Sequence, residues 1–259
     1  MNSRDKGMVY DSGKKEQYSI KVPSWKSFAD HLVFHNRFTG SDIKENVCMF
    51  LDKIIKETQL TYHIPKGTVL YRGRKIAEEE IVKSDGVING FDEKQSGIPP
   101  YRKSHNGRVN IAGIPVLYTA AEHYTACAEL RPIKNDFLSI AEYELKEDIT
   151  VADFVLEHIA NYEDTPEGMI FLKDMFRSFS LPVTNELIDY IPSQFVSEYI
   201  RINHPDISGI RYSSMRHIGG YNIAIFDKDK CHFVRSTVVR CSSVKYEFKD
   251  INVDQVLEL

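Results

Sequence analysis

The sequence predicts an α+β protein in which a mixed sheet with flanking helices follows a helical N-terminal extension. Two patterns predict this class. Apolar residues recur at helical spacing mainly in residues 25–55 and 151–204. Short runs rich in β-branched and aromatic residues, separated by Gly or charged turns, fill most of residues 207–248. With 259 residues, of which 42% are hydrophobic, the chain is long enough to bury a core in one large domain or two small ones.

Residues 1–66 are predicted to form an arm and a helical extension. Residues 1–24 are rich in Lys, Ser, Asp and Gly, which is typical of a loose arm. A short amphipathic helix is expected at residues 25–35 and precedes a longer one that begins at Asp42. Asp42 and Glu45 have the spacing of an N-cap with its reciprocal partner, so they are expected to start the longer helix.

Strands and one helix are predicted to follow from residue 67 onward. Thr68–Tyr71 indicates a strand that ends at Arg72-Gly73-Arg74. Residues 77–106 mix acidic, basic, Gly and Pro residues without a period, which indicates a long irregular segment. The elements expected next are a strand at residues 114–119, a helix at 120–131 that Pro132 stops, and a strand at 138–145.

Helices are predicted to fill much of residues 151–204, interrupted by three prolines, and strands to fill the end of the chain. The prolines are Pro166, Pro182 and Pro192. The strands expected at the end are Ile207–Tyr212, Tyr221–Phe226, His232–Val239 and Val244–Phe248.

Composition argues against several classes of function. The 33 Lys and Arg against 37 Asp and Glu give a net charge of -4, so no global field attracts nucleic acid or an anionic membrane. The four cysteines are widely spaced, without a C-x-x-C pair, and are expected to be free thiols rather than zinc ligands. We find no signal-peptide core in the polar N-terminus and no stretch long and apolar enough to span a bilayer, so a cytoplasmic protein is expected.

The most informative segment runs from Gly107 to Pro132. It carries a G-R-x-N-x-x-G loop, a strand that ends in Tyr118, and a helix that bears Glu129. The segments that accompany it are Leu70-Tyr71-Arg72-Gly73 upstream, and Gly209–Ser214 followed by Gly220–Phe226 downstream. In this order the elements resemble the RES domain, over residues 68–230 or about three fifths of the chain.

This resemblance implies a fold similar to that of ADP-ribosyltransferase toxins, with residues 67–259 as the NAD-binding catalytic domain. It implies cleavage of the nicotinamide-ribose bond of NAD+, which is then a substrate and not a recycled cofactor. The protein would be a glycohydrolase or phosphorylase that arrests growth and is neutralised by a separate antitoxin. A protein ADP-ribosyltransferase and a non-catalytic nucleotide-binding module remain open, as do the acceptor of ADP-ribose and the formation of a homo-oligomer.

Glu129 is the candidate catalytic carboxylate, and the resemblance adds Arg72 and Ser214 as catalytic partners. Cleavage of the bond builds positive charge on the ribose, which a fixed carboxylate stabilises without a metal ion. Thr119 and Glu122 have the spacing of a capping box, which would start the helix and put Glu129 between two and three turns along it. On spacing alone, a solvated helix residue paired with a Lys or Arg is the commoner explanation for Glu129.

Two arginines and their neighbouring glycines are candidates for binding the pyrophosphate. A planar guanidinium holds two phosphate oxygens at once and stays charged, which suits Arg72 and Arg108 to this role, although an Arg more often forms a surface salt bridge. Gly73 and Gly107 would allow the backbone to approach the ligand closely.

Four further residues complete the predicted site. The resemblance puts Tyr118 in the NAD pocket, where its ring would face nicotinamide or ribose, whereas its strand pattern alone favours a core tyrosine. Asn110 is expected to fix its loop through hydrogen bonds to the backbone. The Ser214 hydroxyl suits a ribose or phosphate oxygen, although this chain has Ser213 where the family usually has Pro. Asn222 is the last pocket candidate.

Overall fold

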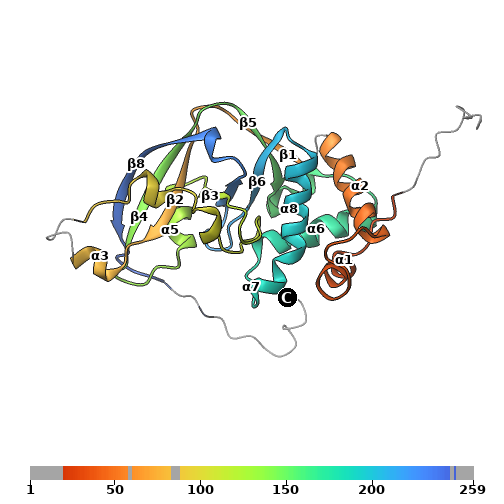
Figure 1. The fold of residues 1–259 in the computed structure, drawn as a ribbon, viewed down its shortest axis with the longest axis horizontal. Coiled ribbons are helices and arrows are strands. Elements are labelled where there is room, and N and C mark those ends of the chain that lie inside the picture. Colours follow the sequence, from red (N-terminus) through yellow and green to blue (C-terminus); the bar gives the residue numbers. More distant parts are fainter. Residues whose placement is uncertain (1–19, 58–59, 83–87, 246–247, 249–259) are drawn as a thin grey trace, which may run out of the picture.

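The computed structural model describes residues 20–57, 60–82, 88–245 and 248, and its strands form one mixed sheet of eight strands (Figure 1). The order across the sheet is β1-β5-β6-β7-β3-β2-β4-β8, and only β5 and β6 pair in parallel. The strands are β1 Thr61–Ile64, β2 Val69–Lys75, β3 Leu117–Ala120, β4 Phe137–Leu145, β5 Ile149–Phe154, β6 Ile207–Ser213, β7 Tyr221–Ile225 and β8 Cys231–Arg240. The predicted α+β class is confirmed.

The described helices differ in length, and the longest belong to two regions of the chain. The α-helices are α1 Trp25–Asp30, α2 Asp42–Lys56, α3 Glu78–Val82, α4 Glu93–Ser96, α5 His123–Glu129, α6 Pro166–Ser180, α7 Glu186–Asp189 and α8 Ile191–Asn203. Short 3-10 or π segments are η1 His31–His35, η2 Tyr101–Lys103, η3 Leu156–Asn161 and η4 Lys228–Lys230. None of the described helices combines the length and the apolar character needed to cross a bilayer.

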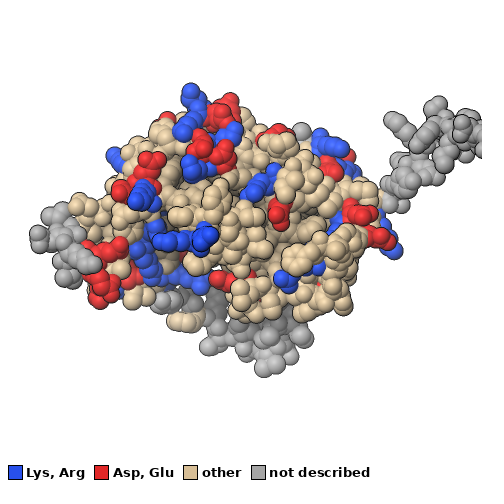
Figure 2. Space-filling model, in the orientation of Figure 1, with Lys and Arg blue, Asp and Glu red and all other residues tan. Residues whose placement is uncertain are grey.

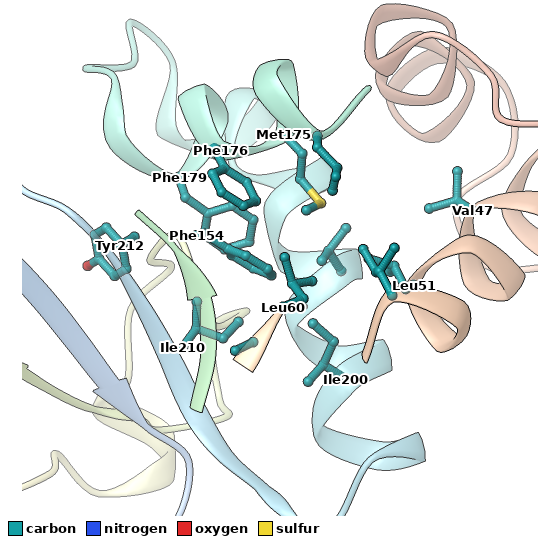
Figure 3. Packing of buried hydrophobic residues seen from close by; sticks show 14 of the residues in the cluster. Val47, Leu51, Leu60, Phe154, Met175, Phe176, Phe179, Ile200, Ile210 and Tyr212 are labelled. Carbon is teal, nitrogen blue, oxygen red and sulfur yellow. The ribbon is translucent and has the colours of Figure 1, made fainter. Parts of the chain in front are cut away.

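One face of β5 and β6 is covered by α6 and α8, and α1 and α2 join these helices in one aromatic core. Phe154 of β5 lies against Phe176 and Phe179 of α6, with ring centroids 5.5 and 4.6 Å apart (Figure 3). Val47 and other apolar residues of α2 belong to the same buried cluster. Since β1 also pairs with β5, the N-terminal extension shares both a core and a sheet with the rest of the chain.

On the same face of the sheet, α5 covers β2, β3 and β4. Tyr118 packs against the aromatic core, and Ala120, two residues later in β3, packs under α5, so the two groups of helices lie side by side on this face. The helix approaches β2 closely because Gly73 has no side chain: a Cβ there would lie 2.8 Å from the Ala126 carbonyl oxygen.

Two strands were missed by the sequence analysis. The predicted helical region 151–204 begins instead with the second half of β5, and β1 lies in the predicted helical extension. Nearly every residue of β5 is buried, because both faces of this strand, which lies between β1 and β6, are covered. Such a strand has no alternation of polar and apolar residues that would distinguish it from a buried helix.

Several predicted ends of elements are also wrong. Ser41 is the N-cap of α2 and Asp42 is its first helical residue, so Asp42 and Glu45 form no capping box. Thr119 is a strand residue whose Oγ1 donates to the Ile223 carbonyl at 2.7 Å, so it cannot cap α5. The N-cap of α5 is Glu122, which makes no capping bond with its side chain.

The irregular segment and the last strand also differ in detail. Arg72-Gly73-Arg74 does not end its strand but continues β2, paired with β4. The segment 77–106 holds the short helices α3, α4 and η2, and residues 83–87 lie outside the described part. The described residues of the expected strand Val244–Phe248 are not extended into the sheet, and residues 246–247 are outside the description.

Candidate active site

The candidate site lies in the gap between α5 and α6, over the middle of the sheet, where two cavities adjoin. The larger cavity, of about 300 Å³, is lined by residues of β2, β3 and α5, among them Tyr71, Arg72 and Tyr118. The smaller one, of about 60 Å³, is lined by polar residues that include Arg108 and Ser213. The residues that line both cavities are Glu129, Tyr212 and Asn222. Glu129 therefore stands where the two cavities meet.

The Glu129 carboxylate is held by two donors from other parts of the chain. Its Oε1 accepts from Ser214 Oγ at 2.6 Å and from Asn222 Nδ2 at 2.7 Å. The backbone N–H groups of Arg216 and His217 both donate to Ser214 Oγ at 3.2 Å, so the hydroxyl proton of Ser214 is directed at Glu129. Within the described residues Oε2 has no hydrogen-bond partner. One oxygen is thus fixed while the other is available to a ligand.

Tyr118 is anchored to the G-R-x-N loop. Its hydroxyl donates to Asn110 Oδ1 at 2.7 Å and accepts from the Val109 N–H at 3.0 Å. Asn110 Nδ2 in turn donates to the carbonyls of His105 and Ile111. Burial raises the pKa of Tyr118 above its usual range, so the hydroxyl stays protonated and keeps this hydrogen bond. These hydrogen bonds therefore fix the position of the Tyr118 ring in the larger cavity relative to the G-R-x-N loop.

Gly107 is needed where this loop passes Tyr118. A Cβ at Gly107 would collide with the Tyr118 hydroxyl and lie 2.8 Å from Asn110 Oδ1. The motif glycine therefore makes room for a side chain of the site itself, and not only for a ligand.

Both predicted arginines donate to backbone carbonyls. Arg72 Nη1 donates to the Tyr118 carbonyl at 2.9 Å, its Nε is buried without a partner, and burial lowers its pKa. Arg108 Nη1 donates to the Ser178 carbonyl at 2.7 Å and Nη2 to that of Leu181, at the C-terminal end of α6. Arg72 thus holds β3 next to β2, and Arg108 ties the G-R-x-N loop to α6.

Sequence reasoning missed three residues that line these cavities. Tyr212 is buried between them, and strand alternation could have found it, because it lies in β6 two residues before Ser214, which directly follows the strand. Arg131 and Arg216 line the smaller cavity. Arg131 follows α5 directly, whereas the turn that holds Arg216 gives no signal in the sequence.

The fold and the site together define an α+β protein with a fixed carboxylate at the junction of two polar cavities. Among the described residues, no group of three or more His, Cys, Asp or Glu side chains is arranged to hold a metal ion.

A family model of the RES domain matches residues 90–249, which is more than half of the chain. The chain belongs to the RES domain family. At the level of the family, this domain is linked to NAD-processing enzymes and to toxin–antitoxin systems. Glu129, Ser214 and Asn222 lie within the matched range, and Arg72 and Gly73 precede it. No curated protein and no solved structure matches the chain significantly.

Proposed function

We infer that this protein cleaves the bond between nicotinamide and ribose in NAD+, with Glu129 as the catalytic carboxylate. The observation that carries the proposal is the pair of short hydrogen bonds to Glu129 Oε1, which leaves Oε2 free at the junction of the cavities. A carboxylate fixed in this way is already oriented before positive charge develops beside it, so no reorganisation is required during the reaction.

In the proposed reaction nicotinamide leaves with the electron pair of the glycosidic bond. The positive charge that remains on the ribose is stabilised by the carboxylate of Glu129. Water then adds to the ribose carbon and loses a proton, so that NAD+ and water give ADP-ribose, nicotinamide and one proton. With phosphate as the acceptor, the product is phosphorylated ADP-ribose.

The other site residues have positioning roles in this proposal. Ser214 and Asn222 orient Glu129, and their loss would leave its carboxylate free to rotate. Arg72 holds the Tyr118 carbonyl, and with it the ring that lines the larger cavity. We assign nicotinamide to that cavity because an aromatic ring there offers a flat apolar surface.

The test compares nicotinamide release from NAD+ by the wild type, Glu129→Gln and Glu167→Gln. Glu167 is an exposed carboxylate in the first turn of α6, away from both cavities, so its variant controls for the loss of one charge. We expect Glu129→Gln to lower kcat by about a hundredfold or more, the scale of losing one fixed electrostatic group in a catalytic centre. Equal release by all three proteins would exclude Glu129 from the reaction.

The acceptor is identified from the products of the same assay. ADP-ribose indicates water, and its phosphorylated form, seen only with added phosphate, indicates a phosphorylase. Nicotinamide release that requires a protein substrate, together with transfer of a labelled ADP-ribose to that protein, would identify a protein ADP-ribosyltransferase instead of a glycohydrolase or phosphorylase. Binding of NAD+ without release would identify a binding module.

A further inference from the structure

A third cavity opens beside the site, in a cleft between α5 and the end of β8. It has a volume of about 800 Å³, and its walls come from α5, from residues 131–133, and from residues 239–245. Arg131 and Arg216 line both this cleft and the smaller cavity next to Glu129. The cleft is therefore a continuation of the candidate active site and not a separate hollow.

Among the described residues that line the cleft, four are cations and none is Asp or Glu. The cations are Arg131, Arg216, Arg240 and Lys245, each exposed. None of these four cations forms an ion pair with a described carboxylate. By contrast, Arg235, which lies with Arg240 on β8, pairs with Glu142 at 2.9 Å. Figure 2 shows Lys and Arg side chains gathered over the region of α5. Like charges without counter-ions repel one another, and a bound anion relieves this repulsion.

The backbone at Arg131 is a second, independent sign of function. Arg131 has φ 49°, in the left-handed region, at the position after α5 where chains most often have glycine. A side chain at such a position costs free energy, and residues of this kind cluster at ligand sites. Glycine would fit this turn without strain, so an arginine that accepts the strain here points to a use for its guanidinium.

Apolar surface completes the cleft beside the cations. The residues that provide it are Tyr124, Pro132, Ile133, Leu138 and Val239. Tyr124 and Ile133 are large side chains that are 66% and 64% exposed. A mixture of flat apolar surface and cations suits a ligand with an aromatic base and phosphates.

We propose that this cleft binds the adenosine-phosphate half of the dinucleotide, with the pyrophosphate on Arg131 and Arg216. The proposal rests on the proposed function, since it takes Glu129 as the point where the glycosidic bond lies. Arg72 and Arg108 are occupied by backbone carbonyls, whereas Arg131 and Arg216 have their guanidinium groups available. The dinucleotide would then extend from the larger cavity, past Glu129, into the cleft between α5 and β8.

The test is calorimetric titration with ADP, which carries the adenosine-phosphate half but has no nicotinamide. The variant Arg131→Gly/Arg216→Ala removes the two guanidinium groups proposed to hold the pyrophosphate, with glycine chosen to suit the left-handed turn, and Lys26→Ala/Lys228→Ala removes two exposed cations elsewhere. We expect the cleft variant to weaken ADP binding by about tenfold or more, the scale of lost hydrogen bonds to charged groups. The control variant should bind ADP as the wild type does.

Turnover of NAD+ gives the second readout. The cleft variant should have a raised KM with kcat unchanged, because the lost contacts act equally on bound substrate and transition state. The proposal is overturned if ADP does not bind the wild type, if both variants weaken ADP binding equally, or if the cleft variant lowers kcat alone. Absence of turnover in every protein would refute the proposed function, while the ADP titration would still decide whether the cleft binds its ligand.

Discussion

The contact between α5 and β2 can be tested by adding a single methyl group at Gly73. A Cβ there would lie 2.8 Å from the Ala126 carbonyl oxygen, 2.8 Å from Leu130 Cδ1 and 3.2 Å from Ile140 Cδ1. The leucine can rotate, but the carbonyl belongs to the backbone of α5. To restore ordinary contact the helix has to move outward by about 0.7 Å.

This displacement predicts two effects of Gly73→Ala. Overpacking costs about 1–3 kcal/mol, and the reduced freedom of the unfolded chain returns about 0.4–1 kcal/mol, so we expect a net loss of about 1–2 kcal/mol in the free energy of unfolding. Glu129 lies one turn after Ala126 and would move away from Ser214 and Asn222. A misplacement on this scale lowers activity by about tenfold or more.

Urea unfolding and nicotinamide release measure the two effects on one preparation. Gly40→Ala is the matched control, because its added Cβ would meet only Glu45 Oε1 at 3.7 Å, an ordinary contact. If Gly73→Ala retained both the stability and the activity of the wild type, the close packing of α5 on β2 would be refuted.

Further predictions concern the buried ion pair, the tyrosines, the dinucleotide and metal ions. Arg211, stacked between two tyrosine rings, lies 3.5 Å from Asp153 and both are about 95% buried. Because His158 Nδ1 also lies 2.7 Å from Asp153 Oδ2, Arg211→Met should cost about 3 kcal/mol or less in urea unfolding, with part recovered on adding Asp153→Leu. No recovery would mean that Asp153 is not the group that loses a counter-ion. Burial raises the pKa of Tyr118 and of Tyr212, so their stabilisation is complete below the unfolded-state pKa of about 10 and is lost as pH rises through their folded-state pKa. Unfolding midpoints should be level to about pH 9 and fall above it, and a fall unaltered by Tyr212→Phe would contradict this assignment. NADP+ should bind at least as tightly as NAD+, because none of the described residues lining the α5/β8 cleft is a carboxylate that would oppose the added phosphate, and much weaker binding of NADP+ would argue against adenosine in that cleft. Turnover should be unchanged by EDTA, and loss on chelation with recovery on adding one metal would refute a reaction based on the carboxylate alone.

Much of the fold could be predicted where a segment has one buried face. The helix α2 was found from its apolar periodicity, and β6 and β8 from their β-branched and aromatic residues. Periodicity could not identify β5, because nearly every one of its residues is buried. The short edge strand β1 was not predicted for the opposite reason: Tyr62 and His63 are exposed, so the segment resembles a loop.

For the site, the sequence identified several residues correctly but could not give the directions of all their side chains. The sequence named Glu129, Ser214 and Asn222 from three separate segments, and in the structure they are joined by hydrogen bonds. The face of the sheet to which the Arg72 side chain points could not be predicted, because the strand was expected to end at Arg72-Gly73-Arg74. Because β2 continues, alternation puts Arg72 on the same face as Leu70 and opposite the face under α5, and its guanidinium reaches the Tyr118 carbonyl.

Arg131 and Arg216 were not predicted because their importance depends on the absence of counter-ions among the described residues around them. That absence is a property of the folded surface and not of spacing along the chain. A charged residue at a turn is ordinary in any sequence, and it becomes informative only when the neighbours that could neutralise it are known.

The pairing of Glu129 with Ser214 and Asn222 also determines when the site can form during synthesis. Glu129 is synthesised 93 residues before Asn222, whose amide holds its carboxylate. For the same reason β3 can pair with β7 only after β7 has been synthesised. Contacts so distant along the chain form late, because a long loop has to close first. The nascent chain therefore stays without an ordered carboxylate until β7, which carries Asn222, has been translated and has paired with β3.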